Sequence, residues 1–146
     1  MEAIGAGPVA LDTVVFIYFI EENALYLPFV QPLFQAVDAQ RVRAVSSSLT
    51  LLEVLVVPYR AGNHALADRY EQILTRGRGL DLLDIYRHQL RVGAYLRAVH
   101  PNLRAPDALQ PAAALGAGCT SFLTNDRTLP SLPGLPVLQL REFVAS

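Results

Sequence analysis

The sequence contains no tryptophan and no lysine, and it has a single cysteine and a single methionine among 146 residues. One cysteine excludes an internal disulfide and fits a reducing compartment, so we expect Cys119 to be an inert buried side chain. The longest apolar run, residues 14–20, is too short to cross a bilayer. The first ten residues lack the basic region of a secretory signal. These absences predict a cytoplasmic protein with no membrane span.

A strong charge of either sign is also missing. The 12 basic and 13 acidic residues give a net charge of −1, so nothing attracts the chain globally to nucleic acid. A polyanion such as a nucleic acid would have to be bound through local contacts and not through the overall charge of the protein. All the basic residues are arginine, which genome composition explains more simply than selection for phosphate contacts. With 52% apolar residues the chain can bury one core, and we expect a single domain over residues 1–146.

Short apolar segments alternate with helical patterns along the chain. We expect strands at residues 9–11, 42–45, 80–83, 119–123 and 137–140. Helices are expected at residues 13–21, 28–39, 51–56, 65–75, 86–99 and 106–116. This alternation predicts an α/β fold with three layers, α/β/α, and a mainly parallel central sheet of about four to five strands.

Some details of these helices are also predicted. Leu90, Tyr95, Leu96 and Val99 are expected to face inward from the helix at residues 86–99. The serines at positions 46–48 are candidate N-caps for the helix that follows them.

Residues 106–126 set the geometry of a candidate site. Asp107 lies in the first turn of a helix, and Asp126 follows the next strand. A helix of roughly ten residues, at about 1.5 Å per residue, returns the length of a strand of roughly five residues. Both acids should therefore lie at the carboxyl ends of the strands. The same criterion selects Asp12, which ends the first strand, and Glu53, which lies early in the helix after the second.

Four carboxylates at one edge of a sheet repel each other unless cations neutralise them. Mg²⁺ and Mn²⁺ are hard ions that prefer oxygen ligands, and such a site needs no histidine or cysteine. The three histidines show no paired spacing typical of a metal site and are expected on the surface. A cluster of this kind activates water and steadies in-line displacement at phosphorus. The pattern therefore predicts phosphodiester hydrolysis.

Each acid also has a purely structural interpretation. Asp12 is a possible cap for the helix after it, and Asp107 can serve the helix dipole alone. Asp126 can simply form a turn with its neighbour. Glu53 and Thr50 have the spacing of a capping box, in which the glutamate only returns to the backbone. Taken singly these interpretations are favoured, and the joint pattern of acids is what favours a functional site.

With those residues in place, the chain resembles a PIN domain and, within that family, the VapC-type toxins of bacterial toxin-antitoxin pairs. The resemblance covers most of the chain and follows its order and spacing. It is carried by four blocks, which lie at residues 11–18, 48–62, 104–115 and 122–127. Two positions depart from the family pattern. Val14 stands where a polar residue is frequent, and Pro111 lies inside a helix, where it weakens one turn by roughly 3 kcal/mol.

The resemblance implies a metal-dependent endoribonuclease that uses one or two Mg²⁺ or Mn²⁺ ions. It implies an RNA substrate, a small antitoxin that blocks the site, and a homodimer. The residues implied as catalytic and metal-binding are Asp12, Glu53, Asp107 and Asp126, with Thr13, Thr124 and Asn125 as polar support.

Two further interpretations concern binding. Arg104 and Arg127 each lie beside an acid of the candidate site, and this adjacency predicts that they bind RNA phosphates. The alternative to an enzyme is a catalytically silent PIN-like module that binds RNA or a partner protein. Aromatic residues near the N-terminal helices would then form a dimer or antitoxin surface, although core packing is their more frequent use. They are Tyr18, Phe19, Tyr26 and Phe29.

Overall fold

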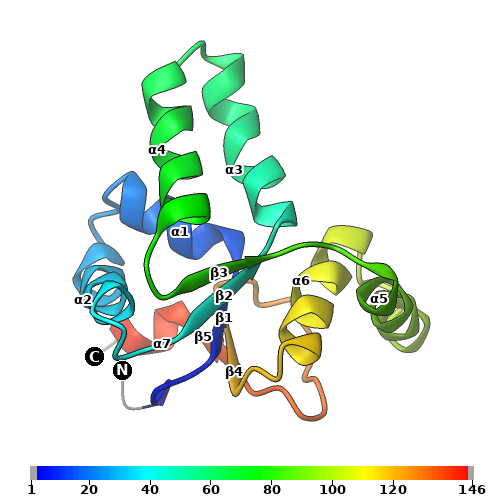
Figure 1. The fold of residues 1–146 in the computed structure, drawn as a ribbon. Helices are drawn as coiled ribbons and strands as arrows, with labels where there is room; N and C mark the ends of the chain where they lie inside the picture. The colour runs from blue at the N-terminus through cyan, green and yellow to red at the C-terminus, as the bar shows by residue number, and fades with distance from the viewer. Residues whose placement is uncertain (1–2, 145–146) are drawn as a thin grey trace.

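A five-stranded sheet in which every strand pair is parallel forms the centre of the protein (Figure 1). The computed structural model describes residues 3–144, so the first two of the ten N-terminal residues considered above lie outside the described residues. The strands are β1 (Val9–Leu11), β2 (Ala44–Ser47), β3 (Leu80–Leu83), β4 (Ser121–Thr124) and β5 (Val137–Gln139). Their order in the sheet is β3-β2-β1-β4-β5. The predicted α/β class is confirmed.

Helices cover both faces of this sheet and complete the three layers. Alternation along β1 sends Val9 and Leu11 into one hydrophobic cluster and Ala10 into the other. The helices are α1 (Thr13–Ile20), α2 (Leu27–Asp38), α3 (Leu49–Arg60), α4 (His64–Arg76), α5 (Arg87–Val99), α6 (Ala105–Gly116) and α7 (Leu140–Val144). Helices α1, α2, α3, α4 and α7 supply the first cluster, and α5 and α6 supply the second.

The order of the strands creates a crevice between β1 and β4. From β1 the chain moves through β2 to β3 on one side, and it then places β4 and β5 on the other side. Ligands of open α/β sheets bind where the strand order reverses in this way, at the carboxyl ends of the strands. Leu11 pairs with Leu123 in the register of β1 and β4, and the Asp12 backbone N–H donates to the Leu123 carbonyl at 3.0 Å. The residues after both strands therefore emerge side by side.

Helix α5 presents a different face to the core from the one that its sequence predicts. Leu96 is buried as expected, but Leu90, Tyr95 and Val99 are 51%, 69% and 53% exposed. The buried face instead contains Gln89 and Gly93. Because Gly93 has no side chain, α5 lies close against α6, and its larger apolar side chains are turned outward. The prediction was wrong for these three residues.

Other departures from the sequence-based boundaries are smaller. Two of the three candidate capping serines belong to β2, while Ser48 is the N-cap of α3 but forms no side-chain capping bond. Helix α6 runs through the buried Pro111 without a break. The short helix α7 follows β5 directly, at a place where no helix was predicted from the sequence. None of the helices in the described part of the chain has the length and hydrophobicity that a bilayer crossing requires.

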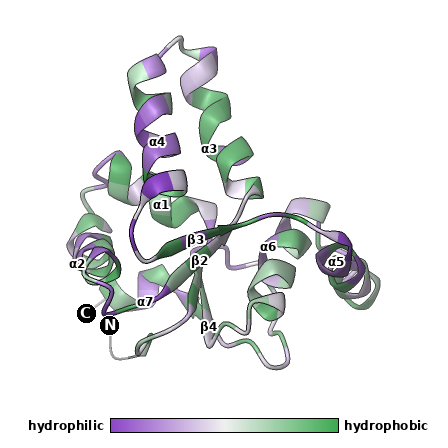
Figure 2. Cartoon of the chain, in the orientation of Figure 1, coloured by the Kyte–Doolittle hydropathy of each residue, from purple (hydrophilic) through white to green (hydrophobic). Residues whose placement is uncertain are grey.

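The N-terminal aromatic residues pack against other rings. Tyr18 stacks on Tyr26 with ring centroids 4.4 Å apart, and Phe19 stacks on Phe34 at 4.1 Å. Phe29 stacks on Phe143 of α7 at 4.5 Å. These contacts support the core-packing interpretation of the aromatic residues. Large exposed apolar side chains lie instead on α3 and α5, and α3 is strongly hydrophobic along much of its length (Figure 2).

Candidate active site

Four acidic side chains line one small pocket at the carboxyl ends of the strands. Asp12 follows β1, Glu53 lies in α3, Asp107 in the first turn of α6, and Asp126 follows β4. The pocket has a volume of ≈ 20 Å³, which is room for about one water-sized occupant. None of the described basic side chains lines it. The structure therefore concentrates negative charge around a space of atomic size.

Asp12 is the acid nearest the centre of the sheet. One carboxylate oxygen accepts from the Thr13 backbone N–H at 2.8 Å, and the other accepts from the Thr124 hydroxyl at 2.7 Å. Burial is the main cause that raises the pKa of Asp12 above its ordinary value, and the charges of Glu53 and Asp126 add to it. The hydrogen bonds from Thr124 and Thr13 act in the opposite direction. Asp12 thus caps α1 and is also a half-buried carboxylate without a cationic partner.

Glu53 points into the same pocket and is not part of a capping box. Helix α3 begins at Leu49 with Ser48 as its N-cap, so Thr50 does not hold the capping position. The Glu53 carboxylate accepts from the Thr13 hydroxyl at 2.7 Å and from the Gln110 side-chain amide at 3.3 Å. Thr13 therefore contacts two acids of the pocket, Asp12 through its backbone N–H and Glu53 through its hydroxyl.

Buried polar residues behind Glu53 escaped the sequence analysis. Gln110 is only 5% exposed, and its amide donates to the Thr50 hydroxyl at 2.9 Å as well as to Glu53. The Thr50 hydroxyl lies 2.8 Å from that of Ser46, which donates to the Leu11 carbonyl. Two features of the sequence could have indicated Gln110. Gln110 lies three residues after Asp107 on one helix face, and it is a polar residue among alanines.

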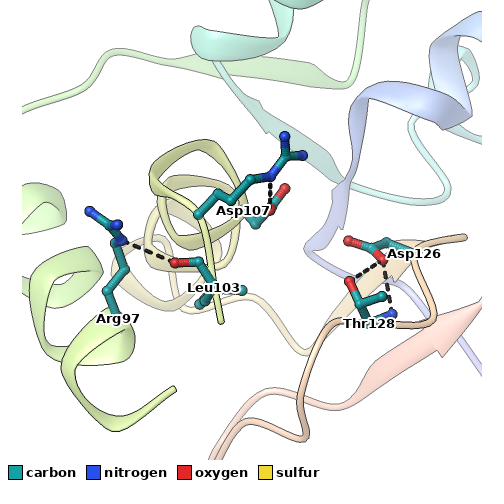
Figure 3. Close-up of polar contacts among 6 residues, drawn as sticks. Arg97, Leu103, Asp107, Asp126 and Thr128 are labelled. Carbon is teal, nitrogen blue, oxygen red and sulfur yellow. Dashed lines mark hydrogen bonds and ion pairs between the residues drawn. The ribbon is translucent and has the colours of Figure 1, made fainter. Parts of the chain in front are cut away.

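The other two acids are held by contacts with residues close in sequence (Figure 3). Asp107 pairs with Arg104 at 3.1 Å, where the arginine side chain is 80% exposed and that of Asp107 is 26% exposed. Asp126 accepts from the backbone N–H and the hydroxyl of Thr128 at 2.9 and 2.6 Å. Its own N–H donates to the Thr124 hydroxyl at 3.0 Å. Thr124 therefore links Asp12 to Asp126, and Asp126 also forms the turn that its sequence suggested.

The structure does not bring Asn125 or Arg127 into the lining of the pocket. The Asn125 side-chain amide donates to the Tyr18 hydroxyl at 3.2 Å, and its side-chain oxygen Oδ1 accepts from the Arg141 backbone N–H at 3.2 Å. Asn125 therefore joins α1 and α7 to the end of β4. Arg127 is exposed on the loop after Asp126.

The donor set of the pocket fits a hard divalent cation. All four acids offer oxygen atoms, which Mg²⁺ and Mn²⁺ prefer, and the charge of Asp12 is uncompensated. Across residues 3–144 no three acidic, histidine or cysteine side chains already converge as a metal-binding group. Each of the four carboxylates accepts a hydrogen bond or an ion pair from a donor in the protein.

Comparison with known proteins identifies the fold. The chain is similar to a chain of a toxin-antitoxin complex from Klebsiella pneumoniae, with 20% identity and a TM-score of 0.65 over 87% of this chain and 94% of that one. It is similar to a chain of VapBC2 from Rickettsia felis bound to a DNA fragment from their promoter, with 17% identity, a TM-score of 0.68 and coverage of 90% and 97%. It is also similar to a chain of DNA-bound VapBC from Salmonella typhimurium, with 20% identity and a TM-score of 0.65 over 90% of this chain and 97% of that one.

No curated protein matches the sequence. The model of the PIN domain family, however, matches residues 9–135, which include all four acids of the pocket. Since this match covers most of the chain, the protein belongs to the PIN domain family.

Proposed function

We propose that the protein is a metal-dependent endoribonuclease and the toxin of a type II toxin-antitoxin pair. The observation that carries the proposal is the pocket lined by Asp12, Glu53, Asp107 and Asp126 at the strand-order switch, with no basic side chain of the described residues in its lining. Four carboxylates around so small a space favour a cation as their occupant. Membership of the PIN domain family and structural similarity to toxin-antitoxin chains support the choice of reaction.

The four acids would hold Mg²⁺ or Mn²⁺, which supplies activation of water and neutralisation of charge at the phosphorus. The surrounding residues orient these acids. Thr13 and Thr124 fix the two oxygens of Asp12, and Gln110 with Thr13 fixes Glu53. We further propose that Arg104 and Arg127, which are exposed beside Asp107 and Asp126, bind backbone phosphates of the RNA.

The proposal includes protein partners and a cytoplasmic location, where RNA and a small antitoxin are available. Exposed apolar side chains support at least one protein partner. Leu52 and Val57 of α3 are 63% and 69% exposed, and Tyr95 of α5 is 69% exposed. Apolar surface of this kind on a single chain often marks an interaction site. A homodimer and an antitoxin complex are the two assemblies that we propose.

A cleavage assay on a mixed pool of cellular RNA tests the enzyme. We expect Mn²⁺-dependent cleavage that EDTA abolishes, and we expect Asp12→Asn and Asp107→Asn to remove it while the variants stay folded by circular dichroism. Asp68→Asn, an exposed acid on α4, is the matched control and should cleave like the natural protein. RNA binding without cleavage by the natural protein would instead favour a catalytically silent module.

Induced expression in a bacterial host tests the toxin role separately. We expect growth arrest with the natural sequence and normal growth with Asp12→Asn at equal protein levels. Co-expression of a short DNA-binding protein encoded beside this gene should restore growth. If the purified protein cuts RNA but no adjacent reading frame suppresses its effect, the chain serves general RNA processing.

A further inference from the structure

A second and larger cavity adjoins the acid pocket. Its volume is ≈ 250 Å³, and it lies between the connection from α5 to α6 and the loop after β4. The two spaces share Asp107 as a lining residue. On the opposite wall lies Thr128, whose backbone N–H and hydroxyl hold the Asp126 carboxylate. A molecule in this cavity would therefore touch a wall of the acid pocket and a residue that orients one of its acids.

The lining combines polar and apolar side chains in a way that suits a nucleobase. His100 and Asn102 supply hydrogen-bonding groups, while Pro101, Leu103 and Pro130 supply apolar surface. Bases that are splayed out of single-stranded RNA are recognised by stacking on flat side chains together with hydrogen bonds to their edges. The cavity is also too small for a helix of a partner protein, whose diameter is about 10 Å.

A phosphate is a poorer occupant than a neutral base. None of the described arginines lines the cavity, and the Asp107 carboxylate places a negative charge in its wall. Arg104 pairs with Asp107 from outside the lining, where its side chain is largely exposed. Phosphate binding normally requires arginine, lysine or backbone N–H groups that point at the anion. The absence of arginine and the presence of the Asp107 carboxylate in the lining therefore favour a neutral base in this cavity, with the phosphate at the proposed cation in the acid pocket.

Hydrogen bonds hold both walls of the cavity in place (Figure 3). The Leu103 N–H donates to the His100 carbonyl at 3.0 Å, and the Arg97 guanidinium donates to the Leu103 carbonyl at 3.0 Å. Leu103 is itself 6% exposed, so it anchors this loop in the core beneath α5 and α6. On the other side, Thr128 is tied to Asp126. Walls that are already ordered lose little freedom when a ligand binds.

We propose that this cavity, defined by His100, Asn102 and Pro130, binds one base of the RNA next to the cleaved phosphodiester and gives the enzyme a base preference at that position. The inference rests on the proposed ribonuclease function and adds a determinant of substrate choice to it. His100 and Asn102 select the base by hydrogen bonds to its edge, and Pro130 supports its face. Asp107 connects the bound base to the site of cleavage.

Cleavage of a randomised single-stranded RNA pool, with the cut ends sequenced, tests the proposal. The natural protein with Mn²⁺ should show a preference at one position beside the cut. In His100→Ala and Asn102→Ala the preference at that position should fall by about tenfold, as expected for lost base-edge contacts. His88→Ala changes an exposed histidine of α5 outside the cavity and should keep the natural pattern. Cleavage by both cavity variants with an unchanged pattern would overturn the proposal.

A binding measurement separates this inference from the proposed reaction. Neutral ribonucleosides are titrated into the metal-free natural protein, since the nearby carboxylates would repel phosphate, and amide shifts are followed by NMR. We expect amide shifts confined to the non-proline residues of 99–103 and to residues 128 and 129, and their loss in the double variant H100A/N102A. If the protein cuts no RNA, the proposed function fails, and these shifts alone decide whether the cavity binds a base. Their absence, or shifts only elsewhere, would reject the cavity as a base-binding site.

Discussion

The two halves of the acid pocket are built in different ways. Asp12 accepts one hydrogen bond from the adjacent Thr13 N–H, but the other groups that hold Asp12 and Glu53, two hydroxyls and a side-chain amide, lie 112, 40 and 57 residues away in sequence. Asp107 and Asp126 are instead held by Arg104 and Thr128, which lie only three and two residues away. The first half is backed by the buried Gln110 and Thr50. The second half faces the adjoining cavity and the solvent-exposed Arg104.

This difference indicates a division of labour within one site. Bonds between distant buried groups form only when the whole domain is folded, so they fix the first pair of carboxylates rigidly. A local pair on the surface contributes little free energy and rearranges easily. We expect the half with Asp12 and Glu53 to bind the proposed cation in a fixed position. The half with Asp107 and Asp126 is expected to change its side-chain conformations when the cation and the RNA bind.

Removing one acid from each half gives the largest expected effects. Asp12→Asn and Asp107→Asn should each lower kcat/KM for RNA by at least about a hundredfold, because each removes the charge of a carboxylate that we propose as a metal ligand. Their effects on the metal-free protein should differ. Asp12→Asn should raise the Tm measured in EDTA, since it removes a half-buried charge without a cationic partner. Asp107→Asn should leave the Tm nearly unchanged. Equal shifts in Tm would contradict the contrast between the halves.

Replacing the glutamine behind Glu53 should give the next largest effect. Gln110→Leu keeps the approximate volume but leaves the acceptors on Thr50 and Glu53 with one donor fewer. We expect about tenfold weaker Mn²⁺ binding by titration calorimetry and a loss of about 1–3 kcal/mol in the free energy of unfolding. Gln72→Leu, on the exposed surface of α4, serves as the control. Natural Mn²⁺ affinity in Gln110→Leu would show that the amide does not position Glu53.

The pH dependence of stability sharpens the same contrast. The pKa of Asp12 is raised above 3.8 in the folded protein, mainly by burial, so the folded state holds this proton more tightly than the unfolded state. The stability that this proton contributes is complete below the ordinary pKa and is lost as the pH rises through the raised pKa. The Tm advantage of Asp12→Asn over the natural protein in EDTA should therefore shrink as the pH falls through the raised pKa toward 3.8. An advantage that grows over this range would have the wrong sign.

The smallest expected effect on stability comes from a substitution beside Asp107, in the half of the pocket formed by Asp107 and Asp126. Arg104→Ala should change the free energy of unfolding by less than about 0.5 kcal/mol, since the arginine side chain is 80% exposed. If this arginine binds an RNA phosphate, the slope of log K against log salt should become shallower by about one unit. Arg69→Ala, an exposed arginine of α4, should keep the natural slope. An unchanged slope in both variants would mean that Arg104 only pairs with Asp107.

Local patterns explain which elements the sequence predicted well. Strands β1 and β3 have the predicted bounds, because short apolar segments between polar turns are local signals. Asn63, a residue type that favours the N-cap position, caps α4 by accepting from the Leu66 N–H at 3.1 Å. The prediction of which face of α5 is buried was wrong, because Gly93 allows close packing against α6 that the hydrophobic pattern does not indicate. Helix α7 was missed because its five residues are too few for a periodic signal.

The sequence by itself determined that Asp12 and Asp126 follow strands, that Asp107 lies in the first turn of a helix and that Glu53 lies early in another, since strand ends and helix starts are encoded locally. Only the tertiary structure decided that β1 lies beside β4, that Gln110 and Thr50 stand behind Glu53, and that a cavity opens next to Asp107. The physical reason is that these contacts join side chains far apart in sequence. Their geometry depends on packing and on the burial of polar groups, which no local pattern of residues records.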